Sequence, residues 1–482
     1  MNGVINKMNE KLIPALSLES ADSCWRSTLA GSALCRPLLN MHERINQWLA
    51  RGAAPKVGTM LQKLSYYLVL VLFAVLAAKQ FANDKEGLAL VVLAAVGLRF
   101  VGSLMGGKES YKPNAMDGVV LLLLASNVVS SFGSHYLQES LFGLAKLVVY
   151  VFAYFLFVGC FQNNPRQRSV ATFAMLTAGA LLVSLYGLYQ FKHHVAPLAT
   201  WEDPTIEDKA VRVFSTLGNP NLLAGYLVPI IPISFVLSAI SFSWRGFWRW
   251  LSVPLLGICG IITLTTVLTG SRGAYIALIL EAAVLLFVGF SWVWKGAPKA
   301  RIPLIIVTLL LPVAAVVLLH FGFPKFEARF LSIFQGTEHS SNAYRVNVWK
   351  SSLEMFKDNW WLGIGTGNKT FRLAYGLYMR SSFDALGTYC VPLEVAVETG
   401  IPGLLIFAWL VIGSMARAHS RFWSAQDSIV RWVALGCAGA LVGMMAHGLV
   451  DTVFLRPQVQ FIFWLAIAVL VALPPQPHGF HD

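Results

Sequence analysis

Residues 272–301 read RGAYIALILEAAVLLFVGFSWVWKGAPKAR, a long apolar run followed by three cations, and this arrangement decides the fold class. Within 273–294 the only charged residue is Glu281. An α-helix needs about 20 such residues to cross the ~30 Å of hydrocarbon in a bilayer. Lys295, Lys299 and Arg301 follow directly, as expected where a helix emerges on the cytoplasmic side. The run is therefore predicted to cross a membrane.

Eleven similar runs occupy much of the remaining chain, and the composition agrees with them. Of the 482 residues 56% are hydrophobic and only 13% are charged, whereas soluble domains carry about 25% charged residues. The runs are too long, and alternate too little, for the strands of a membrane β-barrel. We therefore expect an all-α, polytopic membrane protein with about twelve transmembrane helices. The predicted spans are 64–83, 87–106, 117–134, 141–161, 169–191, 221–242, 250–270, 273–294, 302–322, 395–416, 429–448 and 458–474.

The Lys and Arg residues predict the orientation of these spans. They gather in every second gap, as positive charge does on the cytoplasmic side of a membrane. Both termini are then cytoplasmic, and the net charge of +13 reflects topology rather than nucleic-acid binding. The lipid bilayer is the expected partner, with its anionic lipids nearest the basic gaps. The six scattered cysteines show no disulfide or metal-ligand spacing, so neither a metal nor a cofactor is expected.

The spans divide the chain into five parts. Residues 1–63 are predicted to form a cytoplasmic tail, with an amphipathic helix near 41–52 that anchors at the membrane surface or binds a partner. Residues 64–322 hold the first nine helices and an outer loop at 192–220. Residues 323–394 are predicted to form a helical extracytoplasmic domain, because 344–358 has helical spacing and a glycine-rich turn follows it. Residues 395–474 hold three more helices, and 475–482 form a cytoplasmic tail.

Several outer residues are candidates for binding an anion. Arg272 and Arg345 present planar guanidinium groups that suit phosphate or carboxylate oxygens. The alternatives are a snorkelling interface arginine for Arg272 and a surface ion pair with Glu338 for Arg345. Three further candidates adjoin the sixth span, where a cap or a first-turn anion site is expected. They are Arg212, Asn219 and Asn221.

Other polar residues have structural alternatives as well. Asp451 and Arg456 share the last outer turn, where they are expected to pair with each other. Glu394 and Glu398 lie four residues apart on one helical face, either matching the helix dipole or acting as an acid/base pair.

Two intramembrane residues, Glu281 and Lys146, break the apolar rule. Ionisable groups inside a membrane are functional candidates by default. Lys146 is a conceivable partner for Glu281.

The outer motifs together resemble the O-antigen ligase-like superfamily, which includes the WaaL ligases and Wzy polymerases, from about residue 60 to 474. The motifs that carry this resemblance are Gly218-Asn-Pro-Asn-Leu-Leu-Ala-Gly225, Ser271-Arg-Gly273, the helix from Arg345 to Trp349, Leu362-Gly-Ile-Gly-Thr-Gly-Asn368 and Glu398-Thr-Gly-Ile-Pro-Gly403. The resemblance implies a bacterial inner-membrane protein. It also implies that Arg272 and Arg345 bind the pyrophosphate of a polyprenyl-linked sugar donor.

Other motifs resemble the cyanobacterial IctB branch, whose members are named putative bicarbonate transporters. They are Thr200-Trp-Glu-Asp-Pro204, Ser340-Ser-Asn-Ala-Tyr-Arg-Val-Asn-Val-Trp349, Leu386-Gly-Thr-Tyr-Cys-Val-Pro-Leu-Glu394 and Ala446-His-Gly-Leu-Val-Asp-Thr-Val-Phe-Leu-Arg-Pro-Gln458. True ligases also carry a histidine eleven residues before the glycine that matches Gly400. Tyr389 stands there in this chain. A phenol with an ordinary pKa near ~10 is a poor general base, for which Glu394 or Glu398 could substitute.

Two hypotheses follow from the resemblance. In the first, the protein takes part in transport of bicarbonate or another small anion, with Glu281 along its path. In the second, it is a metal-independent glycosyltransferase that moves a glycan from an undecaprenyl-pyrophosphate donor on the outer face. The branch resemblance and the missing histidine favour the first. The outer domain of 323–394 favours the second, because a small anion has no obvious need for it. No oligomeric state follows from the sequence.

Overall fold

The computed structural model describes residues 13–33, 35–49, 54–78, 85–196, 198, 211–296, 298–334, 340–380 and 383–474. The predicted tail at 475–482, the first twelve residues, most of 197–210 and Glu338 lie outside these ranges. Within them the chain forms only helices and their connections, and eleven helices are long and apolar enough to cross a membrane. The twelfth predicted span is the shorter apolar helix α21. The prediction of an all-α, polytopic membrane protein is confirmed.

The helices follow the predicted spans closely, with two differences at the start and the middle of the chain. The first long helix, α5, covers Ala54–Val75, so it begins ten residues before the predicted span 64–83 and ends eight residues before the end of that span. The predicted span 221–242 is divided into α11 (Pro220–Leu227) and α12 (Ile230–Phe242), since prolines at 229 and 232 remove backbone donors. The other long helices are α7 (Lys85–Leu104), α8 (Ala115–Phe132), α9 (Leu137–Gln162), α10 (Pro165–Lys192), α13 (Ser252–Leu268), α14 (Arg272–Gly296), α15 (Arg301–Gly322), α19 (Val391–Ser424), α20 (Ser428–Gly448) and α21 (Pro457–Ala472).

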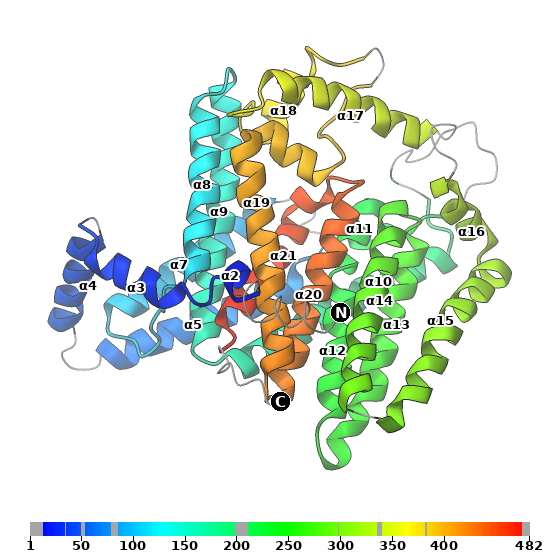
Figure 1. Cartoon of the computed structure of the whole chain (residues 1–482), viewed down its shortest axis with the longest axis horizontal. Helices are drawn as coiled ribbons and strands as arrows, with labels where there is room; N and C mark the ends of the chain where they lie inside the picture. The colour runs from blue at the N-terminus through cyan, green and yellow to red at the C-terminus, as the bar shows by residue number, and fades with distance from the viewer. Residues whose placement is uncertain are drawn as a thin grey trace.

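Helix α21 forms the centre of the bundle. Every residue from Gln458 to Ala472 is buried, and the helix packs chiefly against α9 and α20. Figure 1 shows it enclosed by the longer helices. A helix that is apolar all round is stable only where neighbours or lipid cover every face, and here neighbouring helices cover it.

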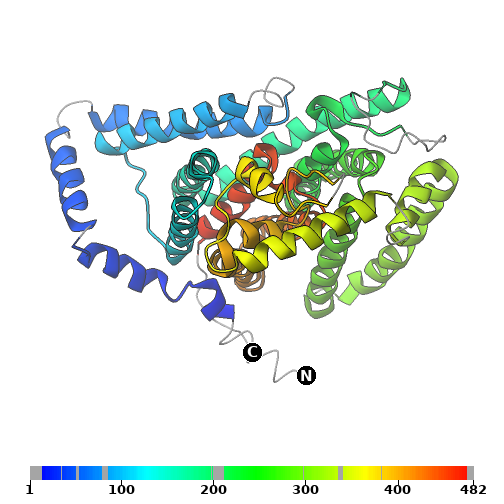
Figure 2. The same ribbon diagram turned by 90° about the horizontal axis from the view of Figure 1, so that it is seen from above.

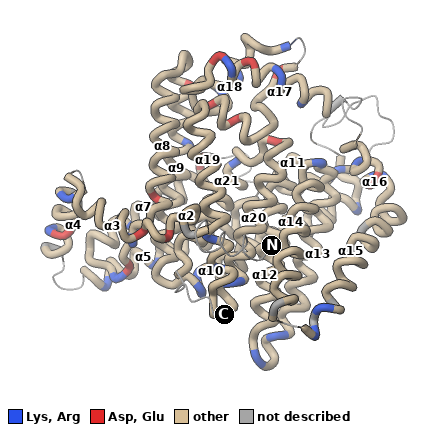
Figure 3. Tube along the Cα trace, viewed as in Figure 1, with Lys and Arg blue, Asp and Glu red and all other residues tan. Residues whose placement is uncertain are grey.

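Contacts between the gaps separate the bundle into two ends. At one end the second, fourth and tenth gaps meet, because Glu109 pairs with Arg168 and Arg166 pairs with Asp427. At the other end Arg272 of the seventh gap contacts Asn342 of the ninth. Lys and Arg lie at both ends of α12 to α15 (Figure 3). After the predicted orientation, we call the end with Glu109 and Arg168 the inner end and the end with Arg272 and Asn342 the outer end.

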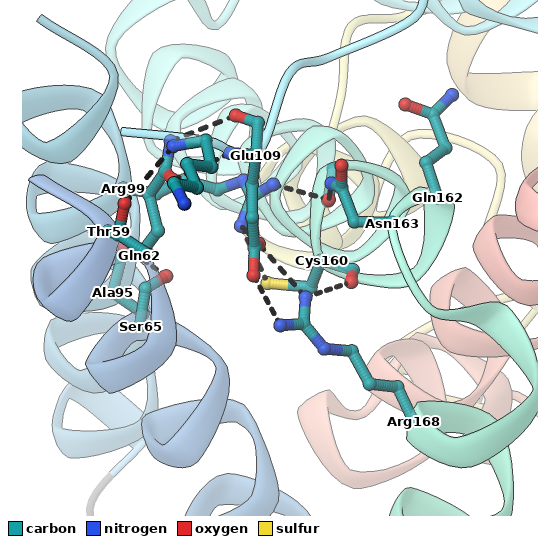
Figure 4. Close-up of polar contacts among 12 residues, drawn as sticks. Thr59, Gln62, Ser65, Ala95, Arg99, Glu109, Cys160, Gln162, Asn163 and Arg168 are labelled. Carbon is teal, nitrogen blue, oxygen red and sulfur yellow. Dashed lines mark hydrogen bonds and ion pairs between the residues drawn. The ribbon is translucent and has the colours of Figure 1, made fainter. Parts of the chain in front are cut away.

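A cluster of polar side chains ties the inner ends of α5, α7, α9 and α10 together (Figure 4). Glu109 accepts hydrogen bonds from Arg99 at 3.0 Å and from Arg168 at 2.9 Å, and Gln62 bonds both the amide N–H and the carbonyl of Glu109. The two guanidinium groups also donate to the carbonyls of Gly159 and Cys160. Burial raises the pKa of Glu109, but the two arginines outweigh it and hold the pKa below its ordinary value.

The segment before the first long helix is held against the bundle rather than free. It forms three short helices, α2 (Ile13–Ser17), α3 (Asp22–Gly31) and α4 (Cys35–Leu49), and α4 includes most of the predicted amphipathic region. Figure 2 shows α3 and α4 reaching out from the central helices towards α7. Arg417 and Arg421 of α19 pair with Asp22 at 3.0 Å and Glu19 at 2.9 Å, which fixes α2 at the inner end.

The outer domain is helical, as predicted for 323–394. It contains α16 (Pro324–Leu331), α17 (Ser340–Asp358) and α18 (Asn368–Tyr375), and Figure 1 shows α17 and α18 above the bundle. The glycine-rich turn docks on a kink in α19, where Gly400 has φ 67° and ψ −170°. Ile364 N–H donates to the carbonyl of Val397 at 2.9 Å, and Gly365 N–H to that of Glu398 at 3.2 Å. Positive φ at Gly363, Gly365 and Gly367 permits this close approach.

Candidate anion-binding site

The start of α11 is built by its own sequence. Asn219 adopts an extended conformation, and its side-chain oxygen accepts from the N–H groups of Asn221 and Leu222 at 2.9 and 3.1 Å. Pro220 takes the first helical position, where no backbone donor is needed. Asn219 is therefore a helix cap. Asn221, two residues further, points its side-chain amide at other elements.

A chain of four polar side chains crosses the outer end of the bundle. Arg212 donates to the Asn221 side-chain oxygen at 2.7 Å, and Asn221 donates to Asp451 at 3.1 Å. Asp451 then pairs with Arg345 of α17 at 3.8 Å. The expected pair between Asp451 and Arg456 does not form, because Arg456 is exposed and the described side-chain partners of Asp451 come from α11 and α17.

Arg272 joins the same region from the first residue of α14. Its guanidinium donates to the side-chain oxygen of Asn342 at 2.9 Å, and Asn342 lies one turn before Arg345 in α17. Arg212 donates from Nε to the carbonyl of Thr269 at 2.8 Å, three residues before Arg272. Arg272 is only 8% exposed, so it is an inward-facing arginine rather than a snorkelling one.

These contacts form one network when the backbone of α17 between Asn342 and Arg345 and that of residues 269–272 are included. Segments far apart in the sequence supply its members, and we call them the outer arginine cluster. Its members are Arg212, Asn221, Thr269, Arg272, Asn342, Arg345 and Asp451. Guanidinium groups present several N–H donors in a fixed fork that matches the oxygens of a phosphate or carboxylate. A cluster with three of them at the end of a membrane bundle can hold an anion that carries several oxygens.

His447 is a member of this region that the sequence motifs did not single out. It is 2% exposed, and its Nε2 lies 3.4 Å from the hydroxyl of Ser271, next to Arg272. The ring packs against Gly273, where any side chain would collide with it. One signal could have found it, because His447 precedes the candidate Asp451 by only four residues, at the end of α20.

Tyr389 lies beside the cluster. Its ring centre is 5.7 Å from that of Tyr344 in α17. Burial raises the pKa of Tyr389 above its ordinary value, and Asp451 adds to the effect while Tyr344 and Arg345 oppose it. The phenol is therefore neutral at ordinary pH, which makes it a still weaker general base than a free tyrosine.

The two candidate glutamates of α19 accept hydrogen bonds from backbone N–H groups. Glu394 is fully buried and accepts from the Thr388 N–H. Glu398 accepts from the Gly367 N–H at 2.9 Å and lines a separate cavity together with Lys146. The structure therefore does not pair Lys146 with Glu281. Glu281 is sealed between α14 and α20 against Gly443, and its carboxyl oxygens have no hydrogen-bond partner among the described residues.

Within the described residues, no group of three or more His, Cys, Asp or Glu side chains is arranged to hold a metal ion. Among the described residues, the outer end instead combines guanidinium, amide and hydroxyl groups with the carboxylate of Asp451.

Comparison with known families gives one match. Residues 257–408 match the family model described as O-Antigen ligase. The matched region runs from α13 into α19, and it includes Arg272, Arg345 and Tyr389, whereas Arg212 and Asp451 lie outside it. No curated protein matches this chain. The match supports the resemblance to membrane proteins of the O-antigen ligase-like superfamily, and it does not extend to the IctB branch.

Proposed function

We propose that this protein is a membrane glycan-transfer enzyme of the O-antigen ligase type, which takes its glycan from a polyprenyl-pyrophosphate donor. The observation that carries the proposal is the meeting of Arg212, Arg272 and Arg345 in one cluster at the outer end. The proposal includes an inner-membrane location, with both termini in the cytoplasm and the outer arginine cluster on the opposite face.

The chemistry of such a transfer suits guanidinium groups. The bond between the sugar anomeric carbon and the pyrophosphate oxygen breaks, a bond forms to an acceptor hydroxyl oxygen, and the proton of that hydroxyl passes to a base at the site or to the departing pyrophosphate. Negative charge grows on the departing pyrophosphate, and donors already fixed in place stabilise it most effectively. Arg272 and Arg345 supply these donors, and Asn342 and Asp451 hold them in position.

The identity of the proton acceptor differs from the ligase pattern, since Tyr389 replaces the histidine. Asp451 and His447 are the basic groups nearest the arginines, at 5% and 2% exposure. Of these, Asp451 has a carboxylate oxygen that already accepts from Asn221. We assign no proton transfer to Tyr389.

The transport hypothesis has weaker support. Glu281, expected along the path of an anion, lines neither the cavity that contains Glu398 nor the inner cavity beside Arg99. The family match is to a ligase rather than a transporter. Bicarbonate transport is therefore the alternative that the experiment below distinguishes from glycan transfer.

The test measures transfer and transport on the same preparations. Purified wild type is expected to carry bound polyprenyl pyrophosphate and to transfer its glycan. Arg345→Gln should lower transfer at least a hundredfold, since removal of one such donor typically costs 10²–10³-fold. Arg380→Gln is the matched control, because Arg380 is an exposed arginine of the same outer domain, paired with Glu354 at 3.8 Å.

Two outcomes would contradict the proposal. One is uptake of labelled bicarbonate into proteoliposomes above the level of empty liposomes, abolished in Arg272→Ala, with no glycan transfer. The other is equal transfer by wild type and Arg345→Gln. Tyr389→His is expected to raise transfer, because it restores a group whose pKa lies near neutral.

A further inference from the structure

A second polar site lies in a cavity between α8, α9, α19 and α21, beneath the glycine-rich turn. Its volume is about 130 Å³. Three features that stood apart in the sequence meet there, namely Lys146 of α9, Glu398 of α19 and the turn at Thr366 and Gly367. The outer arginine cluster uses none of them.

Lys146 and Glu398 face the cavity without pairing with each other. No described carboxylate lies within ion-pair distance of Lys146, although its ammonium group sits on a membrane-spanning helix. Glu398 uses one oxygen, Oε1, to accept from the Gly367 N–H, which fixes its carboxyl group in the wall. Ionisable groups at this depth mark ligand sites more often than structural ones.

The remaining wall combines aromatic rings with amides that are already satisfied. Tyr150, Phe407, Phe463 and Trp464 contribute rings. Gln460 accepts from the Trp464 indole at 3.1 Å and donates to the carbonyl of Phe454 at 3.0 Å. Because these groups satisfy one another, Lys146 and the second oxygen of Glu398 are the charged groups of the wall with capacity left for a ligand.

The separated cation and carboxyl select the ligand class. A simple anion would meet the carboxyl of Glu398, and a simple cation would meet the ammonium of Lys146. A hydroxyl group both donates and accepts, so neighbouring hydroxyls can donate to Glu398 and accept from Lys146 at once. The aromatic rings provide a flat apolar surface for the C–H face of a ring. We propose that this cavity binds a saccharide.

The position of the cavity relates it to the outer arginine cluster. Asp451 begins the turn that continues as the short helix η6 (Val453–Leu455), and Phe454 and Leu455 line the cavity. The two sites thus lie on either side of one short segment. If the proposed transferase function holds, the cavity is a place for the glycan acceptor; saccharide binding itself does not depend on that function.

The test is saturation-transfer NMR on the full-length protein in nanodiscs, with methyl β-glucoside and methyl β-galactoside as probes. Wild type should transfer saturation to the ring protons of at least one glycoside. Lys146→Met and Glu398→Gln should each reduce the transfer at least fivefold, and Lys146→Arg should retain it. Lys369→Met is the matched control, because Lys369 is an exposed lysine over the Phe142 ring at 5.3 Å.

Several results would overturn the inference. One is the absence of saturation transfer from wild type to either glycoside. Another is undiminished saturation transfer in both Lys146→Met and Glu398→Gln at an unchanged unfolding temperature. Displacement of the glycoside by inorganic phosphate, with binding that survives in Glu398→Gln but not in Lys146→Met, would identify an anion site instead. Arg345→Gln separates the two proposals, since it should abolish glycan transfer and leave glycoside binding intact.

Discussion

Two arginine clusters occupy opposite ends of this protein and differ in what their guanidinium groups contact. At the inner end, Arg99 and Arg168 share the carboxylate of Glu109 at 3.0 and 2.9 Å. At the outer end, Arg272 contacts an amide oxygen, and Arg345 lies 3.8 Å from the carboxylate of Asp451. The inner carboxylate is in direct hydrogen-bond contact with both guanidinium groups, whereas the outer carboxylate lies 3.8 Å from the guanidinium of Arg345. We expect the inner contacts to hold helices together and, under the proposed function, the outer guanidinium groups to bind a ligand.

The largest effect should come from removing the shared carboxylate. Glu109→Gln leaves two guanidinium groups that are each 12% exposed without their counter-charge. Breaking a buried ion pair in this way costs about 3–5 kcal/mol. We expect a clear drop in the thermal unfolding temperature. Asp384→Asn is the control, because Asp384 and Arg372 are more than half exposed and such pairs contribute about 0–1 kcal/mol. Equal shifts in the two variants would contradict the stabilising role of the buried carboxylate of Glu109.

Arginine-to-lysine changes sharpen the comparison at an intermediate scale. Arg272→Lys keeps the charge and loses the planar fork, so glycan transfer should fall about 10- to 100-fold, or ~1.4–2.7 kcal/mol, with little change in unfolding temperature. Arg99→Lys should do the reverse, because Arg99 bonds both Glu109 and the carbonyl of Gly159. Glycan transfer and the unfolding temperature are measured on both variants. The comparison is contradicted if both variants lose mainly glycan transfer, or both lose mainly stability.

A smaller effect is expected at His447. The variant His447→Gln keeps polar atoms near Ser271 but changes the contact that Nε2 makes at 3.4 Å. One hydrogen bond contributes about 1 kcal/mol, which corresponds to roughly a fivefold loss of transfer. A loss of a hundredfold or more would show that His447 takes part in the chemistry itself, and no loss would show that it only packs against Gly273.

The smallest effect is the response of the inner cluster to pH. The folded-state pKa of Glu109 is lowered, so its contribution to stability is present above the ordinary carboxyl pKa of ~4.3 and is lost as pH falls through the folded value. The contribution of Glu109 to the unfolding temperature should therefore stay constant between pH 5 and 8, and the unfolding temperature should decline in more acid solution. In Glu109→Gln this part of the acid decline should be absent, and an unaltered acid profile would contradict the assignment.

Much of this architecture follows from local sequence alone. The apolar runs located the membrane helices, because hydrocarbon accepts only segments whose backbone groups are satisfied internally. The order of the predicted gaps separated the two ends, since the second, fourth and tenth gaps meet through the pairs of Glu109 with Arg168 and of Arg166 with Asp427, and which end faces the cytoplasm stays a prediction. The motifs around Arg272 and Arg345 also identified two arginines that the structure places in one network.

Only the tertiary structure decided which polar groups meet. Asp451 pairs with Arg345, which is distant in sequence, rather than with its neighbour Arg456. Lys146 shares a cavity with Glu398 instead of contacting Glu281, and His447 joins Ser271 across two helices. Sequence periodicity states which face of a helix is polar, but the partner across that face depends on how helices are packed and rotated against one another, and that is set by contacts along the whole bundle.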